Sequence, residues 1–136
     1  MSPPILIEGY ASLFGISDAA SDTVRAGAFA RSLRRRPFVP MLLQHRRGAI
    51  AGRWTRIVED GRGLFVRGLV DAPGARSMIE RGLDGLSIGF RARIAKPLSA
   101  SGRMLIDLEL VEISLVANPM QPLARFVVPQ AVRRAA

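Results

Sequence analysis

The sequence predicts an α+β fold that is mainly β: a small antiparallel β-barrel flanked by helices. Short segments of alternating apolar and polar residues recur along the chain, and turn-forming residues separate them. Two further segments have helical signals. With 136 residues, 49% of them hydrophobic, the chain is large enough to bury a core as one domain. We therefore expect a single domain over residues 1–128 and a short basic tail over residues 129–136.

The first part of the chain is expected to hold one strand and one helix. Residues 5–15 (ILIEGYASLFG) have the composition of a strand that ends in a turn. Residues 21–36 (SDTVRAGAFARSLRRR) are expected to be helical. Ser21 or Asp22 can cap the first turn of this helix, and Pro37 ends it.

The rest of the chain is expected to be mostly strand. Strand-like segments occur at 40–46, 49–59, 63–71, 86–98 and 103–118, with a short one within 123–136. The loop sequence EDGRG indicates a hairpin between the second and third of these strands. Residues 72–84 (APGARSMIERGLD) are expected to form the second helix, because a proline suits its first turn.

The charge of the chain is unevenly distributed. The net charge is +9, and the segment from Thr23 to Val58 contains nine arginines and no acidic residue. Such a segment could attract an acidic protein or nucleic acid, or could simply be a solvated basic surface. No glycine-rich phosphate loop, zinc pattern or aromatic stacking motif accompanies the charge. Nucleic acid is therefore not expected to be the primary partner.

Several kinds of site are excluded or not expected. The chain has no cysteine, which excludes disulfides, thiolate metal sites and cysteine nucleophiles. One histidine and scattered carboxylates form no recognisable ligand set, so no metal is expected. No apolar run reaches the roughly 18 residues of a membrane span. No signal peptide is visible, so no membrane partner is expected.

Two residues have unusual positions in the predicted strands. His45 shares the parity of Met41 and Leu43, so it is expected to face the same side as these apolar residues. Glu112 falls on the face of strand 103–118 that otherwise looks like core. A buried carboxylate needs hydrogen-bond donors or a cation, which an arginine or the imidazole of His45 could supply.

Ser87 lies between two glycines in GLDGLSIGF (82–90), where it is either a turn residue or a nucleophile. Combined with His45 and Glu112 it would form a serine-nucleophile site. The histidine would take the hydroxyl proton, and the carboxylate would orient the ring. Ser114, on the same strand face as Glu112, is the competing nucleophile.

Three motifs carry a resemblance to a known family. The most specific is GLSIGF (85–90) followed by EISLVANP (112–119); PMLLQHRRGAIAGRW (40–54) is moderately specific, and EGYASLFG (8–15) is weak alone. The chain resembles the prohead maturation proteases of tailed phages, serine peptidases that share a fold with the assemblins of herpesviruses. The resemblance covers most of the chain and implies an assemblin-like fold.

The resemblance implies a histidine base at His45, a serine nucleophile at Ser87 and a carboxylate third member at Glu112. The herpesvirus enzymes have a second histidine in place of this carboxylate. Ser114 ranks below Ser87, because the resemblance places the nucleophile in GLSIGF. The mechanism needs only side chains and water, so no cofactor is implied.

The oxyanion donors are less clearly indicated. The herpesvirus enzymes have an arginine pair soon after their third catalytic residue, and the matching region here contains only Arg125. We therefore expect the donors among backbone N–H groups near Ser87 or Gly89, or at Arg91.

The implied function is a serine endopeptidase that matures a viral or virus-like prohead. Its substrates and partners would be scaffold, or the N-terminal extension of the major capsid protein, together with the protease itself. It would act as a homodimer inside the assembling prohead, in the cytoplasm of the bacterial host.

Two alternatives are a catalytically inactive assembly or scaffolding module and a basic nucleic-acid-binding domain. Many relatives carry a further C-terminal scaffold-like region. The short chain fits either a compact prophage or gene-transfer-agent member or a form trimmed by self-cleavage.

Overall fold

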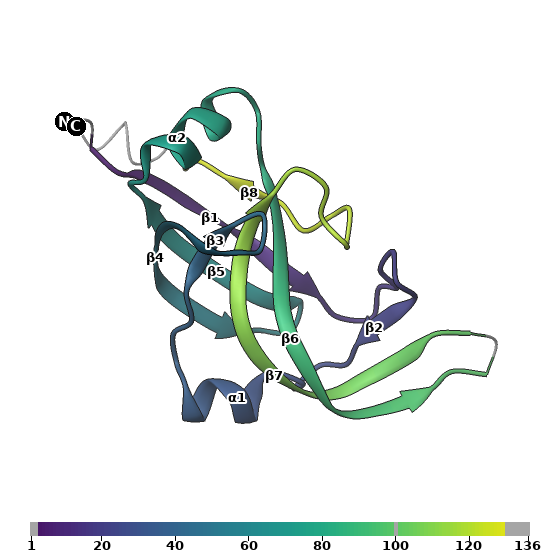
Figure 1. The fold of residues 1–136 in the computed structure, drawn as a ribbon. Helices are drawn as coiled ribbons and strands as arrows, with labels where there is room; N and C mark the ends of the chain where they lie inside the picture. Colours follow the sequence, from purple (N-terminus) through teal and green to yellow (C-terminus); the bar gives the residue numbers. More distant parts are fainter. Residues whose placement is uncertain (1–2, 100, 130–136) are drawn as a thin grey trace.

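The computed structural model describes residues 3–99 and 101–129 of the chain. These residues form one curled sheet, with two short helices at opposite ends of it (Figure 1). The strands are β1 (Ile5–Leu13), β2 (Asp22–Val24), β3 (Met41–Leu43), β4 (Arg46–Glu59), β5 (Gly63–Val70), β6 (Gly85–Pro97), β7 (Arg103–Val116) and β8 (Phe126–Val127), and the helices are α1 (Ala30–Arg35) and α2 (Pro73–Glu80).

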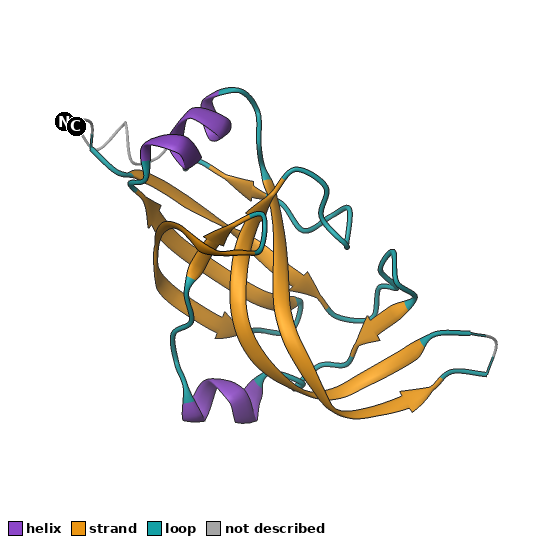
Figure 2. Ribbon diagram, viewed as in Figure 1, coloured by secondary structure: helices purple, strands orange, loops and turns teal. Residues whose placement is uncertain are grey.

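Strand β7 organises the sheet because it pairs with three other strands. β6 pairs antiparallel with β7 along its whole length, and the two form the long curved hairpin of Figure 2. Along its other edge, β7 pairs with β2 near its start and with β3 near its end. Both of these pairings are parallel, whereas the sequence predicts an antiparallel barrel. Parallel neighbours need a crossover between them, and the segment containing α1 separates β2 from β3.

The sheet curls back on itself. From β3 it continues through β4, β5, β1 and β8. An isolated bridge between Gly85 and Arg125 then links the start of β6 to the segment that leads into β8. The arrangement is therefore a small barrel flanked by helices, as the sequence predicts.

The core lies inside the curl. Residues from almost every strand contribute side chains that are fully buried, with the largest numbers from β7. They include Ile7, Met41, Leu64, Val66, Leu86, Leu105, Leu108, Leu110, Ile113 and Leu115. Burial of these apolar side chains is the main stabilising term for such a fold.

The prediction of a helix over residues 21–36 is wrong in its first half. Asp22–Val24 form strand β2, and the helix begins only at Ala30. Two guanidinium nitrogens of Arg103 donate to the Asp22 carboxylate, both at 2.9 Å, which fixes β2 beside β7. Gly27 has φ +92°, a conformation that a right-handed helix does not contain. A tertiary ion pair thus overrides the local helical signal.

Other element boundaries differ by a few residues. The second helix ends at Glu80 rather than at residue 84, before Gly82 with φ +109°. The strand expected over 40–46 ends at Leu43. The terminal strand is limited to Phe126–Val127, and from residue 130 the predicted tail lies outside the described residues. Within the described part of the chain, neither helix has the length or apolar character needed to cross a membrane.

Candidate active site

His45 lies in a tight turn between β3 and β4, not in a strand. Leu43 pairs with Arg46, so Gln44 and His45 are the two central residues of a hairpin. Their φ angles are 54° and 61°, the left-handed values that a type I′ turn requires at both positions. Neither residue is glycine, so each costs about 1 kcal/mol of backbone strain. The expectation that His45 faces the apolar side of a strand is therefore wrong, and 42% of its side chain is exposed.

Three hydrogen bonds attach this turn to the end of β7. The Gln44 N–H donates to the Leu115 carbonyl at 2.9 Å, and the His45 N–H donates to Ser114 Oγ at 3.1 Å. The Ala117 N–H donates to Gln44 Oε1 at 3.1 Å. These contacts offset the strain of the turn and set the position of the imidazole relative to β7.

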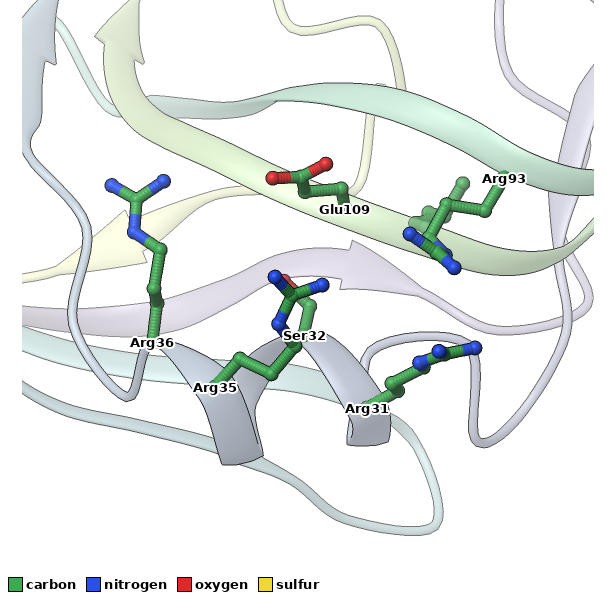
Figure 3. Close-up of a pocket in the computed structure, with 7 residues that line it drawn as sticks. Arg31, Ser32, Arg35, Arg36, Arg93 and Glu109 are labelled. Carbon is green, nitrogen blue, oxygen red and sulfur yellow. The ribbon is translucent and has the colours of Figure 1, made fainter.

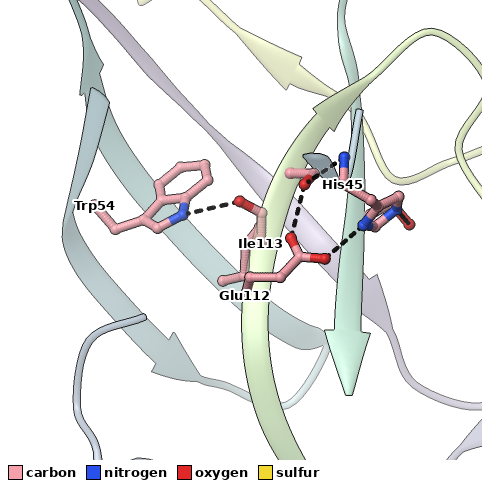
Figure 4. Close-up of polar contacts among 6 residues, drawn as sticks. His45, Trp54, Glu112 and Ile113 are labelled. Atoms are coloured by element: carbon pink, nitrogen blue, oxygen red, sulfur yellow. Dashed lines mark hydrogen bonds and ion pairs between the residues drawn. The ribbon is translucent and has the colours of Figure 1, made fainter. Parts of the chain in front are cut away.

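The imidazole lies between the side chains of Glu112 and Ser87. His45 Nδ1 is 2.5 Å from Glu112 Oε2 (Figure 4). On the other side of the ring, His45 Nε2 is 3.1 Å from Ser87 Oγ. An ionised carboxylate can only accept, so Nδ1 carries a proton and donates it to Glu112. In the neutral ring, Nε2 is then an acceptor for the Ser87 hydroxyl. The structure therefore brings together the three residues that the sequence singles out.

Glu112 is buried, and both of its oxygens have donors. Oε2 accepts from His45, and Oε1 accepts from the Ser114 hydroxyl at 2.7 Å. Gly89 lies directly opposite Glu112 on β6, and a Cβ at Gly89 would collide with the carboxylate. Glycine at this position is what leaves room for a carboxylate inside the barrel wall. Of the two partners that the sequence leaves open for Glu112, the structure selects His45.

Hydrogen bonds on β7 hold the site in register. The Trp54 indole N–H donates to the Ile113 carbonyl at 3.3 Å (Figure 4), and the Ile113 N–H donates to the Pro40 carbonyl at 3.1 Å. Ser87 is buried on β6 and pairs with Ser114 across the hairpin. Each side chain of the cluster therefore comes from a strand or turn whose backbone is fixed by its neighbours.

The Glu112 contact changes the titration of His45. The hydrogen bond to Glu112 raises the pKa of His45 above its ordinary value of 6.5, and the carboxylate charge adds to the rise. Partial burial of the ring lowers the pKa, and this effect is smaller than that of the hydrogen bond. A raised pKa makes Nε2 a stronger proton acceptor toward Ser87 once the ring is neutral.

Comparison with known proteins places this geometry in a family. The family model of the caudovirus prohead serine protease, Peptidase_S78, matches residues 3–133. The chain belongs to this family. It is 31% identical over 124 residues to the prohead protease of Enterobacteria phage HK97, covering 84% of this chain and 55% of that protein. The chain therefore spans about half the length of that relative.

Herpesvirus proteins are also similar to the chain. It is 32% identical over 73 residues to the capsid scaffolding protein of equine herpesvirus 1 (strain Ab4p), covering 54% of this chain and 11% of that protein. The structure of the KSHV protease with a hexapeptide phosphonate inhibitor has a TM-score of 0.65 at 12% identity and covers 91% of this chain and 64% of that one. The varicella-zoster virus protease has a TM-score of 0.56 at 16% identity, covering 82% and 57%. These structures confirm that this member of the prohead protease family has an assemblin-like fold.

Ser114, the competing serine of the sequence, lies beside Glu112 near the end of β7. It is fully buried, its hydroxyl donates to Glu112, and it accepts from the backbone N–H of His45 rather than contacting the ring. This bridging contact was not predicted from the sequence. The shared parity of Ser114 and Glu112 on one strand was the signal for it, because residues two apart in a strand lie on one face.

The expected oxyanion groups lie at different distances from the cluster. Gly89 is two residues from Ser87 on β6, whereas Arg91 is four residues away, about 13 Å along an extended strand. The Arg91 guanidinium lies 3.8 Å from Glu109, and that of Arg125 lies 2.6 Å from Asp84. Neither arginine contacts the three clustered side chains.

Cavities flank the cluster on two sides. A groove of about 410 Å³ lies on the side of His45 and Glu112. A small, mostly apolar cavity of about 30 Å³ adjoins Ser87. Within the described residues, no three His, Asp or Glu side chains gather as metal ligands would.

Proposed function

We propose that this chain is a serine endopeptidase with Ser87 as nucleophile, His45 as general base and Glu112 as the third catalytic residue. The observation that carries the proposal is the continuous hydrogen-bonded path from Ser87 Oγ through both imidazole nitrogens to Glu112. Membership of the prohead serine protease family supports the same assignment.

The proposed mechanism follows from the directions of these hydrogen bonds. Ser87 Oγ attacks the carbonyl carbon of the scissile peptide bond while His45 Nε2 takes its proton. Glu112 stabilises the imidazolium that forms and keeps Nδ1 protonated. His45 then donates the proton to the leaving amine, which releases the first product and leaves an ester on Ser87. A water molecule, deprotonated by His45, hydrolyses this ester.

The tetrahedral intermediates need donors for their oxyanion. We retain the backbone N–H of Gly89 as a proposed donor, because it lies near Ser87 on the same strand. Arg91 is the less favoured of the two sequence candidates, since it lies farther along β6 beside Glu109.

We further propose that the substrates are scaffold or the N-terminal extension of the major capsid protein, with cleavage of the protease itself. The enzyme would act as a homodimer inside the assembling prohead, in the host cytoplasm. Light scattering of the purified chain over a range of concentrations tests the dimer, and an unchanged monomer mass at micromolar concentration would remove that part of the proposal.

The central test uses a biotinylated peptide phosphonate that reacts covalently with activated serines. We expect mass spectrometry to locate the adduct on Ser87 in the wild-type chain and to find none in Ser87→Ala. Co-expression with the major capsid protein gives the second readout, a shortened capsid protein only with wild type. Equal capsid masses together with no labelling would favour the inactive assembly module.

A further inference from the structure

A second charged site lies between helix α1 and the β6–β7 hairpin, outside the His45 cluster. It is a cavity of about 120 Å³. Arg31, Arg35 and Arg36 line it from α1 and its C-cap, Arg93 lines it from β6, and Glu109 from β7 (Figure 3). Arg93 comes from outside the basic segment of the sequence, so only the fold brings these four arginines together.

The four arginines of this pocket outnumber the two carboxylates beside them, Asp107 and the pocket-lining Glu109, which lies 3.8 Å from Arg91. Asp107 lies 3.7 Å from Arg31 and 3.4 Å from Arg93 and partly neutralises these two. Arg35 and Arg36, both exposed, form no ion pair and no side-chain hydrogen bond with any residue in the described part of the chain. Two planar guanidinium groups are therefore free to pair with an added anion.

The arginine pocket is built on fixed elements. The Leu110 N–H of β7 donates to Ser32 Oγ of α1 at 2.9 Å, and the Leu108 N–H donates to the Ala28 carbonyl at 3.0 Å. These bonds hold the short helix against β7. Binding of a ligand would therefore include no free-energy cost for ordering the helix.

The arginine pocket also borders the groove beside the candidate catalytic residues. Arg36 lines both cavities, and Arg47 lines the groove together with His45. The rest of the groove is largely apolar, including Ile50, which is 54% exposed, and Val111. Apolar contacts flanked by arginines suit a polypeptide. Single-stranded nucleic acid prefers aromatic stacking platforms, and no aromatic residue lines either cavity.

We propose that the arginine pocket binds an acidic side chain of a polypeptide segment, and that this segment belongs to the substrate and docks away from the bond that is cut. A volume of about 120 Å³ has room for one Asp or Glu carboxylate. Guanidinium groups pair with carboxylates through two parallel hydrogen bonds. The assignment to the substrate rests on the proposed function, whereas binding of the acidic segment does not.

The test measures binding without catalysis. Ser87→Ala protein is titrated against a fluorescent peptide of alternating Glu and Ala, with a Gln and Ala peptide as the uncharged match. Arg35→Gln/Arg36→Gln is compared with Arg53→Gln/Arg56→Gln, which removes the same charge from exposed sites on β4 that line neither cavity. We expect the pocket variant to lose about tenfold in affinity and the control less than twofold. Thermal unfolding checks that both variants fold.

Equal losses in the two double variants would overturn the proposal, since the general positive field would then explain binding. Equal affinity for the Glu and Gln peptides, or a tighter pocket-dependent complex with a single-stranded oligonucleotide, would also overturn it. In the active chain, we expect Arg35→Gln, which lies in the arginine pocket and not in the groove beside His45, to slow capsid-protein processing but not phosphonate labelling of Ser87. Peptide binding without any processing or labelling would refute the proposed function and leave the binding site standing.

Discussion

Replacement of Gly89 by alanine should disable the site through a single added methyl group. The Cβ of alanine would lie 2.8 Å from Cδ and 2.9 Å from Cγ of Glu112, and closer still to Oε2. Ordinary van der Waals contact begins at 3.4 Å, so Oε2, the nearest atom, has to move by more than about 1 Å. A movement of this size away from the imidazole lengthens the 2.5 Å contact between Glu112 Oε2 and His45 Nδ1 beyond hydrogen-bond distance. Alanine keeps the backbone N–H of Gly89, so any loss is due to the methyl group.

The expected size of the effect follows from known costs of misplacement. An error of about 1 Å in a catalytic group can lower the rate about 100-fold, and we expect a loss of that order in phosphonate labelling of Ser87. Overpacking a tight site also costs about 1–3 kcal/mol of folding free energy. Because the hydrogen bond that His45 donates to Glu112 is the main cause of the raised pKa of His45, that pKa should fall toward its ordinary value.

Two assays separate these effects. His45 is the only histidine, so an NMR titration of the imidazole reports on the site without overlap from another histidine. Labelling kinetics and thermal unfolding give the rate and the stability. Gly61→Ala is the matched control, because its Cβ would meet no atom within 4 Å. If Gly89→Ala kept the raised pKa of His45 and labelled within twofold of wild type, the reasoning from the close contact would be refuted.

Four further predictions concern the same cluster. Glu112→Gln should lower the pKa of His45 and slow labelling by about 10³- to 10⁴-fold, since the ring loses its charged partner; an unchanged His45 titration would contradict the assignment of that partner. Labelling by wild type should rise with pH through the raised pKa of His45, above 6.5, because only the neutral ring accepts the Ser87 proton. The contribution of the His45–Glu112 pair to folding stability depends on pH in the opposite sense. It is complete below pH 6.5 and is lost as the pH rises through the raised pKa of His45 in the folded protein. Denaturation of wild type and Glu112→Gln at several pH values measures this contribution. Ser114→Ala should lower the free energy of unfolding in urea by about 1–3 kcal/mol and should slow labelling, because the buried Glu112 Oε1 loses its donor and the His45 N–H loses its acceptor. Labelling at the wild-type rate would argue against a positioning role for Ser114.

The local sequence pattern was sufficient to predict most strands, whereas the residues of the candidate site were indicated by the family resemblance together with the parity of Glu112. The alternation in β5 and in the middle of β7 reflects one buried and one more exposed face, which short-range periodicity encodes. Glu112 was expected inside the barrel from its parity alone, and it is buried. Parity failed near the start of β7, where Leu105 is buried instead of Met104 or Ile106, because register shifts interrupt the β6–β7 pairing there.

Local pattern failed where long-range contacts select the conformation. The segment containing Asp22 has helical composition, but its carboxylate pairs with Arg103, 81 residues away. Gln44 and His45 have no turn signature, since type I′ turns favour Asn and Gly. Their left-handed conformation is maintained by hydrogen bonds to β7, which no local window of sequence contains.

The sequence alone determined which side chains are available: one histidine, a serine between glycines, and a carboxylate at a core position. It also determined the periodicities that make the chain mainly β. Only the tertiary structure decided that Ser87 and Glu112 both lie within hydrogen-bond distance of His45. Ser87 is 42 residues from His45 in the sequence, and Glu112 is 67 residues from it. It also decided that Arg93 joins the arginines of α1. The physical reason is that strand register and the attachment of the β3–β4 turn depend on contacts distant in sequence, whereas side-chain type and periodicity are local properties.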